Sequence, residues 1–451
     1  MTSEERNQML LHEPVNKVIP RLAVPSIISM LISAIYNMAD TFFVSQIGTS
    51  ASAAVGVTFS IMSIIQAVSF TIGMGSGTNV SQALGAGDEE RARRYVATGV
   101  ISAFGIGMVI AVLGLSSIHP LVRFLGATPT IEPYAIDYAT YIFYGTPFMM
   151  ASFAMNNLLR FEGLAAYGMI GISTGGLLNM ALDPLLIFGM GLGTAGAAIA
   201  TAISQFVSFC ILLYMSNTRP DAIAIRLRHF RPTAGMYGRI LYNGFPSLGR
   251  QGIASISTIL LNTTAAAYGD AAIAAMSIVS RFVMFINSSV IGFGQGFQPV
   301  CGFSYGAGAY GRVREAFSYC VKVATCILLV LGLIAMLLSS QIITVFRRDD
   351  VEVIRIGTTA LRLQLMTIPL WGFIVMSNMF TQSIGYGLRA TLISISRQGL
   401  FLIPALIVLP GIFGLLGIQM AQPFSDALAF VLSFVVSRGI LRQLRNMEAQ
   451  R

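Results

Sequence analysis

The sequence predicts an all-α polytopic membrane protein, with twelve transmembrane helices arranged in two pseudo-symmetric six-helix bundles. Three observations lead to this prediction: an apolar composition, a series of long apolar segments, and an internal repeat. Of the 451 residues, 55% are hydrophobic and only 10% are charged, and the mean hydropathy is +0.74. Soluble domains carry about 25% charged residues. A chain of this composition belongs in a lipid bilayer.

Apolar segments recur along the whole chain, and the polar interruptions between them are short. A transmembrane helix needs about 20 predominantly apolar residues. Segments that meet this requirement lie at residues 20–46, 51–80, 93–117, 134–158, 165–189, 194–216, 240–268, 271–300, 313–338, 352–383, 390–412 and 415–438. Residues 1–17 mix both charge signs and show no signal-peptide cleavage pattern, so the first segment is expected to stay in the protein.

The basic residues indicate the orientation of the chain. The net charge is +9, but the arginines and lysines lie in short loops between apolar segments, which argues against a nucleic-acid partner. Most lie at the termini and in the loops after even-numbered segments, whereas the loops after odd-numbered segments hold Arg123, Arg347, Arg348 and Arg355. Since cytoplasmic loops are enriched in Lys and Arg, both termini are expected to be cytoplasmic.

The longest polar stretch divides the chain near its middle. It reads NTRPDAIAIRLRHFRPTAGMYGR, occupies residues 217–239 and contains five arginines. We therefore expect an N-terminal six-helix lobe at residues 1–218 that carries the ion coupling, a basic cytoplasmic linker at 219–239, and a C-terminal six-helix lobe at 240–451.

An internal repeat relates the two halves. When the sequence is shifted by 221 residues, Pro25-Ser26 falls on Pro246-Ser247, and the motif GAGDEERAR (85–93) falls on GAGAYGRVR (306–314). The same offset still holds at residue 204, where Ser204 meets Ser425. Six spans per repeat give both halves the same topology, so the axis that relates them runs along the membrane normal, as in parallel-repeat transporters. Two such bundles enclose a cleft that can open to alternate sides of the membrane.

An acid lies inside the first apolar segment, in the stretch YNMADTFFVSQIG (36–48). A carboxylate at mid-helix in lipid costs about 2.5–3.5 kcal/mol on insertion scales, and such residues usually face a bundle interior or a wet cavity. Asp40 is therefore a candidate functional residue. The alternative is that Asp40 only caps the outer end of the first span.

A second acid lies in the fifth apolar segment, in GLLNMALDPLLIFG (176–189). Asn179 and Asp183 are spaced i, i+4 and share one helix face. Pro184 has no N–H, which frees the Met180 carbonyl and favours a kink. Carboxylate, amide and carbonyl oxygens at one depth could hold Na⁺, or two nearby carboxylates could share a proton. The alternative is an Asp-Pro helix break near the membrane interface.

The C-terminal half lacks both acids, which provides an internal control. At the offset of 221, Asp40 corresponds to Leu261 and Asp183 to Pro404. A purely architectural acid should recur in both halves, so we assign the ion chemistry to the N-terminal bundle. Asp426, in the twelfth span, has no recognisable partner in the sequence and is given no role. The C-terminal spans instead contain basic residues, namely Arg250, Arg281 and Lys322.

No catalytic or metal-cluster pattern is present. The four cysteines lie in or beside apolar segments without metal-ligand spacing, and the three histidines are scattered along the chain. We find no paired histidine and acid and no Ser/His cluster. The sequence therefore predicts a protein that is not an enzyme and needs no cofactor.

The chain resembles the multidrug and toxic compound extrusion (MATE) family, in its bacterial multidrug export branch. The resemblance covers essentially the whole chain. It is carried by YNMADTFFVSQIG, by the paired motifs GAGDEERAR and GAGAYGRVR, by QPVCGFSYGAG (298–308), and by NMALDPLLIFG followed by GTAGAAIATAISQ. It implies two six-helix lobes around a central cleft in the bacterial inner membrane, and efflux of small cationic, amphipathic drugs or toxic compounds in exchange for Na⁺ or H⁺. We expect the transporter to be a monomer.

The resemblance also implies an ion site in the N-terminal lobe. The residues at the matching positions, which would also bind Na⁺ as the coupling ion, are Asp40, Asn179, Asp183 and Thr201, with Tyr36 and Asn156 as polar neighbours. The branch of the family that uses further acids in the C-terminal lobe is not matched. A C-lobe ion site is therefore not expected.

Residues that would contact the substrate are harder to identify in the sequence than the ion-site residues. Met and Phe are abundant, at 23 and 29 residues, and Met-rich surfaces adapt to varied ligands. Candidates for lining the cleft are Gln66, Gln251, Gln295 and Arg281, each with interhelical hydrogen bonding as the alternative. The main rival function is a flippase for lipid-linked sugars, which shares the wider superfamily architecture and would need cationic residues such as Arg250 and Arg281 in its cleft.

Overall fold

A computed structural model describes residues 3–346 and 350–450, and in this part of the chain every regular element is a helix. The predicted all-α fold is confirmed. Arg347 and Arg348, two of the basic residues from which the membrane orientation was predicted, lie outside the described residues.

The first half of the chain contains eight α-helices. They are α1 (Ser3–His12), α2 (Val15–Ser45), α3 (Thr49–Gly85), α4 (Glu89–Ser116), α5 (Ile118–Phe124), α6 (Glu132–Phe161), α7 (Ala165–Pro184) with the π-turn η1 (Leu185–Gly189), and α8 (Gly193–Thr218). A short 3₁₀ turn, η2 (Leu227–His229), lies in the basic linker.

The second half repeats the pattern. It contains α9 (Ala234–Ala266), α10 (Asp270–Gly306), α11 (Tyr310–Leu337), α12 (Ser339–Phe346), α13 (Val351–Ser383), α14 (Gly387–Ile395) with the π-turn η3 (Ser396–Phe401), α15 (Leu402–Phe413) and α16 (Leu415–Ala449).

Each of the twelve predicted spans coincides with one long helix or with helices joined by a π-turn. Within the described residues, ten of these are long and apolar enough to cross a membrane. The other two, α6 and α9, are 30 and 33 residues long but more polar. The second half of α6, which carries Asn156, Asn157 and Arg160, is covered by protein, because every residue from Met149 to Phe161 is buried and the helix packs on α3, α4 and α8.

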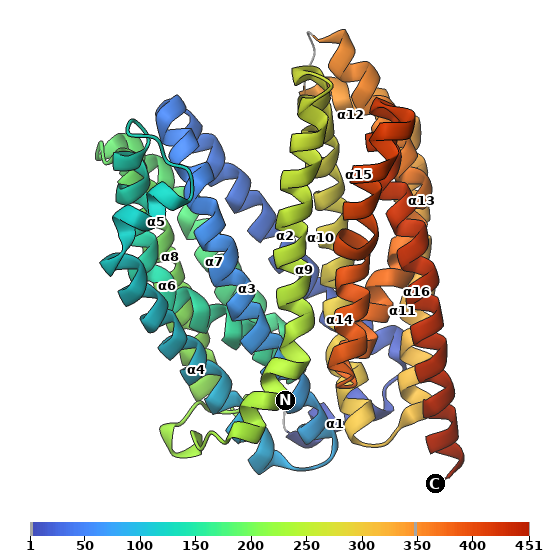
Figure 1. Ribbon diagram of the computed structural model, residues 1–451. Coiled ribbons are helices and arrows are strands. Elements are labelled where there is room, and N and C mark those ends of the chain that lie inside the picture. The colour runs from blue at the N-terminus through green and yellow to red at the C-terminus, as the bar shows by residue number, and fades with distance from the viewer. Residues whose placement is uncertain (1–2, 347–349, 451) are drawn as a thin grey trace.

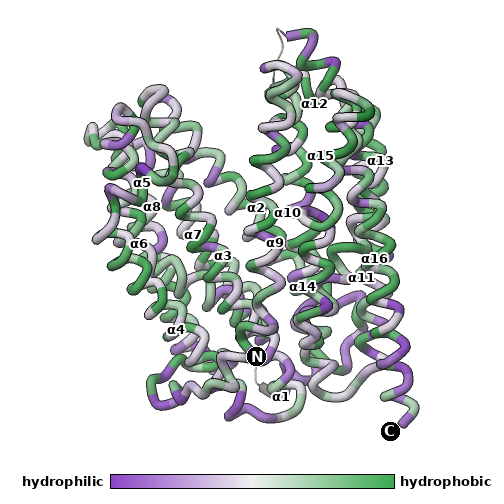
Figure 2. Tube along the Cα trace, viewed as in Figure 1, coloured by the Kyte–Doolittle hydropathy of each residue, from purple (hydrophilic) through white to green (hydrophobic). Residues whose placement is uncertain are grey.

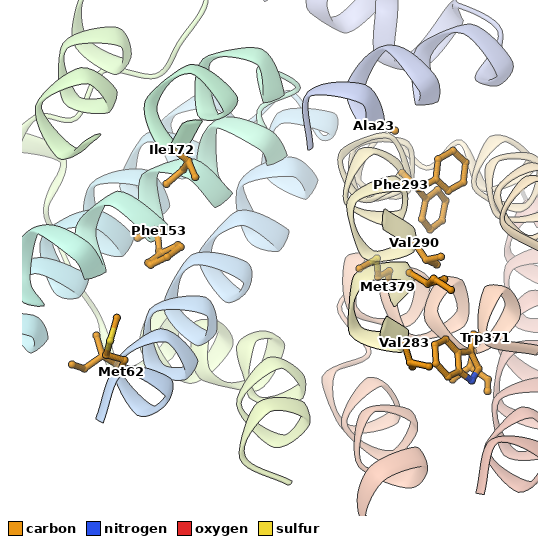
Figure 3. Close-up of a cluster of buried hydrophobic side chains, with 14 of the residues drawn as sticks. Ala23, Met62, Phe153, Ile172, Val283, Val290, Phe293, Trp371 and Met379 are labelled. Atoms are coloured by element: carbon orange, nitrogen blue, oxygen red, sulfur yellow. The ribbon is translucent and has the colours of Figure 1, made fainter. Parts of the chain in front are cut away.

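The helices form two bundles, α2–α8 and α9–α16, which approach each other at the end that carries both termini and diverge toward the other end (Figure 1). Hydrophilic residues gather at the end with the termini (Figure 2). The buried hydrophobic side chains of the two bundles form one continuous cluster. Met62, Phe153 and Ile172 are its members from the first bundle, and Val283 and Trp371 from the second (Figure 3). Helix α2 packs both on α7 of the first bundle and on α10 of the second, so it links the two.

Glycines let the two bundles touch through their backbones. A Cβ at Gly85 of α3 would lie 2.0 Å from the carbonyl oxygen of Phe303 on α10, and a Cβ at Gly306 would lie 2.1 Å from that of Gln82. These two contacts are equivalent under the repeat offset. Gln82 adds a hydrogen bond from its Nε2 to the Ser383 carbonyl at 2.8 Å. These glycines begin the two copies of a Gly-Ala-Gly sequence, residues 85–87 and 306–308, here called the GAG motifs. The first glycine of each GAG motif is therefore a contact point between the bundles.

The last glycine of each GAG motif ends its helix. Gly87 and Gly308 have φ angles of 75° and 73°, a conformation that favours glycine because it has no Cβ. After Gly87, the Asp88 N–H reaches back to the Ala83 carbonyl at 2.9 Å, which is the hydrogen bond of a Schellman motif. The three residues of the motif thus encode one inter-bundle contact and one helix end.

Helix α1 joins the two bundles at the same end. Its Leu10 side chain is fully buried. Arg6 Nη1 donates to the Asp221 carbonyl in the linker at 2.8 Å. Arg312, in the second copy of the GAG motif, donates from Nε to the Leu10 carbonyl at 2.9 Å and from Nη2 to the Glu13 carbonyl at 2.6 Å.

Glu162 is buried beside this junction, in the short loop between α6 and α7. Its carboxylate accepts a hydrogen bond from the Ile223 N–H at 2.9 Å. Burial raises the pKa of the Glu162 carboxyl from 4.5 to about 7, and the nearby Asp221 adds to this effect, whereas the Ile223 N–H and Arg6 act in the opposite direction.

This environment predicts a pH-dependent stability. The folded-state pKa of Glu162 lies above the unfolded value, so folding favours the protonated carboxyl. The stability that this protonation contributes is fully present below pH 4.5 and is lost as the pH rises through about 7. The loss amounts to about 3 kcal/mol. Melting temperatures of the purified protein at about pH 5 and about pH 8 should therefore differ more for the wild type than for Glu162→Gln. Equal differences in the two proteins would show that another group titrates.

Candidate functional site

The structure brings the predicted ion-site residues together from three helices of the first bundle. Asp40 lies on α2, Asn179 and Asp183 lie on α7, and Thr201 lies on α8. Asn179 is 2% exposed, Asp183 0% and Thr201 5%. These three side chains therefore sit inside the protein, and Asp40 is half-buried.

Asp40 does not cap a helix. Helix α2 continues past it to Ser45, and the Asp40 carboxylate turns toward α6, where its Oδ2 accepts from the Tyr138 hydroxyl at 3.5 Å. The other oxygen, Oδ1, is buried and has no hydrogen-bond partner among the described residues. Tyr138 was not anticipated, because an aromatic residue in an apolar span carries no signal that separates it from core packing.

Asp183 is the more isolated acid. Both of its carboxylate oxygens are buried and neither has a hydrogen-bond partner in the described part of the chain. Asn179 uses its Nδ2 to donate to the Thr201 hydroxyl at 3.2 Å, which leaves the Asn179 Oδ1 without a partner. Asp40 and Asp183 lie on α2 and α7, which pack against each other.

A small cavity lies next to these residues. It measures about 10 Å³, which is at the lower limit of the space that holds one water molecule. Residues from these three helices and from α6 line it: Tyr36, Phe153, Ile172, Gly175, Gly176, Asn179, Thr201, Ser204, Gln205 and Ser208. The oxygens Gln205 Oε1 and Ser204 Oγ are also buried without partners.

Three lining residues of α8 were missed in the sequence. Ser204, Gln205 and Ser208 follow Thr201 at helical spacing and share its face, so the i, i+3, i+4, i+7 pattern of polar residues was the available signal. Together these oxygen atoms form the kind of donor set that a hard cation prefers. The same arrangement can hold a proton, because closely spaced carboxylates favour protonation of one of them.

Pro184 ends α7, and the backbone then makes the π-turn η1. π-Turns are often found at functional sites. Asn156, predicted as a supporting residue, lies outside the cavity lining; its amide instead packs against Gly168, where a Cβ would lie 2.4 Å from the Asn156 Oδ1. Tyr36, the other predicted neighbour, does line the cavity.

The four cleft candidates lie in different environments. Gln66 and Gln251 are half-buried, Arg281 is exposed, and no hydrogen bond joins any of the four to another among the described residues. Gln295 is buried on α10 and its Nε2 lies 4.0 Å from the Met30 sulfur on α2.

The C-terminal basic residues differ in their exposure. Arg281 and Lys322 are exposed and Arg250 is half-buried.

One sequence reading was wrong. Asp426 is not unpaired: its Oδ1 forms an ion pair with the Arg397 Nε at 2.7 Å. The residues are 29 positions apart, and the sequence showed no reason to join them.

No group of three or more His, Cys, Asp or Glu that could hold a metal occurs in the described residues. Transition-metal sites are usually built from such groups. A cation at the α2, α7 and α8 site would instead be held by carboxylate, amide and hydroxyl oxygens.

Comparisons with known proteins extend over the whole chain. The family model described as MatE matches residues 25–185 and 246–408, and the two matches begin 221 residues apart, at the offset of the internal repeat. The multidrug export protein MepA of Staphylococcus haemolyticus is 26% identical over 422 residues, which cover 93% of this chain and 93% of MepA.

Solved structures agree with this match. A crystal structure of MATE in complex with MaL6 has a TM-score of 0.93 and 28% identity, over 98% of this chain and 99% of that one. An outward-facing multidrug resistance MATE family transporter of the MOP superfamily has a TM-score of 0.92 and 28% identity, over 97% and 98% of the two chains.

Proposed function

Because the chain belongs to the MatE family, whose model matches most of its length, we propose that it is a multidrug efflux transporter that exports cationic, amphipathic compounds in exchange for Na⁺ or H⁺. The curated relatives that support this proposal are multidrug export proteins. The transported cation is a second substrate in this scheme, and no resident cofactor is needed.

The observation that carries the proposal is the unsatisfied acid pair. Asp40 and Asp183 sit in adjacent helices of one bundle with three buried carboxylate oxygens that lack partners among the described residues. Buried carboxylate oxygens without partners are costly, and a gain from the charge of these acids would explain why three such oxygens are retained. Taking up a proton or Na⁺ removes that cost, and releasing it restores the charge.

The helices that hold the acids can transmit this change. Helix α2 carries Asp40, contains Pro20 and Pro25 in its interior, and packs on both bundles. Proline removes a backbone hydrogen bond and allows a helix to bend. Cation binding at Asp40 and Asp183 is proposed to shift α2 and the α7 π-turn, and so to move one bundle against the other and release the drug from the cleft.

We propose that the protein lies in the bacterial inner membrane as a monomer with cytoplasmic termini, and that residues 1–218 and 240–451 act as the two lobes, joined by the linker 219–239. The basic linker and the arginines of both GAG motifs support this orientation, since they lie at the end of the bundles that carries the termini.

The flippase alternative is not favoured. The curated relatives that cover this chain are multidrug export proteins, which favours drug efflux over transport of a lipid-linked sugar.

Dye efflux from proteoliposomes under separately imposed Na⁺ and pH gradients tests the proposal. Ethidium export driven by at least one of the two gradients is expected. Export driven by neither gradient, or transport of a lipid-linked oligosaccharide in place of ethidium, would contradict it.

Asn179→Ala distinguishes the two coupling cations. The Asn179 Oδ1 is a buried oxygen without a partner, and loss of one such ligand costs about 1–3 kcal/mol. With Na⁺ as the coupling ion, the Na⁺ concentration for half-maximal efflux should rise about tenfold or more. With H⁺, the pH dependence should change little, because the amide does not titrate. Asn217→Ala is the matched control, since Asn217 is exposed on α8 and should leave efflux unchanged.

A further inference from the structure

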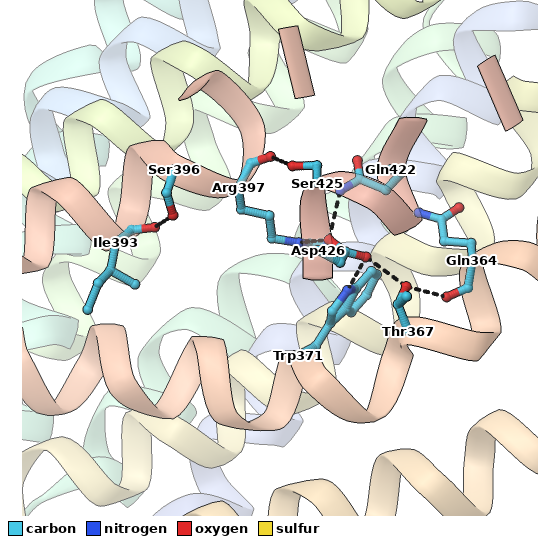
Figure 4. A network of polar contacts seen from close by, with 9 residues as sticks. All are labelled: Gln364, Thr367, Trp371, Ile393, Ser396, Arg397, Gln422, Ser425 and Asp426. Atoms are coloured by element: carbon cyan, nitrogen blue, oxygen red, sulfur yellow. Dashed lines mark hydrogen bonds and ion pairs between the residues drawn. The ribbon is translucent and has the colours of Figure 1, made fainter. Parts of the chain in front are cut away.

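A dense polar network occupies the interior of the second bundle. Asp426 on α16 is fully buried, and both of its oxygens are satisfied (Figure 4). Oδ1 accepts from Arg397 Nε at 2.7 Å and from Gln422 Nε2 at 2.9 Å. Oδ2 accepts from Trp371 Nε1 at 2.7 Å and from the Thr367 hydroxyl at 3.1 Å. The guanidinium of Arg397 also stacks over the Trp371 ring, 3.8 Å from its centroid.

The π-turn η3 fixes the backbone of Arg397. A π-turn leaves carbonyl groups without their usual helical partners, and here neighbouring helices supply the donors. The Ser425 hydroxyl donates to the Arg397 carbonyl, and the Ser257 hydroxyl of α9 donates to the Gln398 carbonyl at 2.5 Å. Arg397 is therefore anchored at its backbone as well as at its guanidinium.

The repeat relates this network to the cavity of the first bundle. At the offset of 221, Arg397 corresponds to Gly176, Gln422 to Thr201 and Asp426 to Gln205. All three N-lobe residues line the cavity beside Asn179. Where the first bundle has a glycine, the second has an arginine, and where the first has a neutral glutamine, the second has the acid that binds it.

The cavity of the first bundle and the Asp426 network of the second bundle also differ in whether their oxygens have hydrogen-bond partners. In the first bundle Gln205 Oε1, Asn179 Oδ1 and both oxygens of Asp183 have no partner in the described chain. In the second bundle the carboxylate of Asp426 receives four hydrogen bonds. The first bundle therefore offers oxygens without partners to a cation. At the equivalent positions the second bundle already contains a cation, the guanidinium of Arg397.

We propose that Arg397 is a tethered cation that permanently fills the C-lobe counterpart of the N-lobe ion site, so that only the N lobe exchanges ions during transport. The inference rests on the proposed function in one respect, namely that the N-lobe site is the one that binds the coupling ion. A covalently attached guanidinium cannot leave, so the charge of the second bundle stays constant while that of the first changes.

Chemical rescue tests this inference. Arg397→Gly gives the second bundle the residue that the first has at this position, and leaves the Asp426 carboxylate beside a space of guanidinium size. The protein should melt several degrees lower, and millimolar guanidinium or methylguanidinium should restore the melting temperature. Tetramethylammonium at the same concentration should not, because it carries the charge without N–H donors.

The matched control is Arg397→Gly/Asp426→Gln, which reproduces the neutral N-lobe pair and should show no response to guanidinium. Every protein in the series carries Asp40→Asn/Asp183→Asn, so that the N-lobe site cannot contribute. A loss of melting temperature that guanidinium does not restore, or a restoration that persists after Asp426→Gln, would overturn the inference.

A second comparison covers the case in which Arg397→Gly does not fold. Arg397→Lys keeps a tethered cation and Arg397→Gln does not, so the lysine variant should melt at the higher temperature. A glutamine variant at least as stable as the lysine variant would also overturn the inference. Failure of these melting experiments counts against the C-lobe assignment alone. Normal efflux after Asp183→Asn in the otherwise wild-type chain counts against the proposed function and the N-lobe premise, and leaves the assignment of Arg397 to Asp426 standing.

Discussion

Asp183→Asn is expected to abolish cation-coupled efflux while the protein still inserts, folds and is at least as stable as the wild type. Asp183 is fully buried on α7, and neither of its carboxylate oxygens has a partner among the described residues. Asparagine has nearly the same shape and no charge. It can neither take up and release a proton nor balance the charge of Na⁺.

The expected direction of the stability change distinguishes a functional acid from a structural one. An ionised carboxylate at the centre of a membrane helix costs about 2.5–3.5 kcal/mol, so removing an unpaired charge does not destabilise the fold. An acid that held helices together would behave in the opposite way, because its substitution would leave donors without an acceptor.

Efflux of ethidium from proteoliposomes and the melting temperature of the same purified protein measure the two effects. Asp137→Asn is the matched control, because Asp137 is an exposed acid next to Tyr138 on α6. Efflux should be lost in Asp183→Asn and retained in Asp137→Asn. Full coupled efflux by Asp183→Asn would refute the proposed role of this acid.

Asp40→Asn should produce the same loss, and combining it with Asp183→Asn should add little. Residues that act as one unit are strongly non-additive. Coupled efflux that survives in Asp40→Asn would indicate that Asp183 acts without it.

The acids could be found in the sequence because a carboxylate stands out in an apolar segment. Asp40 and Asp183 were identified in this way, and the structure places them in one bundle. Their neighbours could not be found by the same argument. Tyr138 lies on a helix whose rotation relative to α2 and α7 depends on packing between spans, which one sequence does not specify. Gln205 had a signal of another kind, its i, i+4 spacing from Thr201.

The pairing of Arg397 with Asp426 was missed for a related physical reason. An arginine and an acid in separate apolar spans give no signal until the fold sets their distance. The π-turn at Ser396–Phe401 adds one residue to a helical turn, so the direction in which Arg397 points could not be inferred from regular helical spacing.

Two helices, α3 and α10, extend further than the hydropathy of the sequence predicted. The second and eighth spans were predicted to end at residues 80 and 300, but α3 and α10 continue to Gly85 and Gly306 and are 37 residues long. Such a helix measures about 55 Å, whereas the hydrocarbon layer is about 30 Å thick. Hydropathy marks where the helix leaves the membrane, and the glycine at the end of the GAG motif marks where the helix stops.

Gly85→Leu is expected to abolish transport by preventing the two bundles from closing at the end that carries the termini. A Cβ at Gly85 would lie 2.0 Å from the Phe303 carbonyl oxygen, and this neighbour is backbone that cannot rotate away. Overpacking of this kind costs about 1–3 kcal/mol, which is comparable to the free energy that separates two conformations of a protein. The open state of this end should therefore become the major population.

Labelling of a single cysteine at the interface measures this shift. Thr71 is 4% exposed, and its carbonyl lies against Gly244 of the second bundle. The experiment uses a chain in which the four native cysteines are replaced and Thr71→Cys is introduced. An impermeant maleimide is applied from the side of the termini. The cysteine should react at least about tenfold faster when Gly85→Leu is also present. Gly306→Leu should act in the same way, because the repeat places it in the equivalent contact with Gln82.

Gly105→Leu is the control for the side chain itself, since a Cβ at Gly105 on α4 has no heavy atom within 4 Å. It should change neither the labelling rate nor the efflux. Unchanged labelling in Gly85→Leu, together with normal efflux, would mean that the bundles do not need this contact to close. In that case the paired GAG motifs would serve only to end their helices.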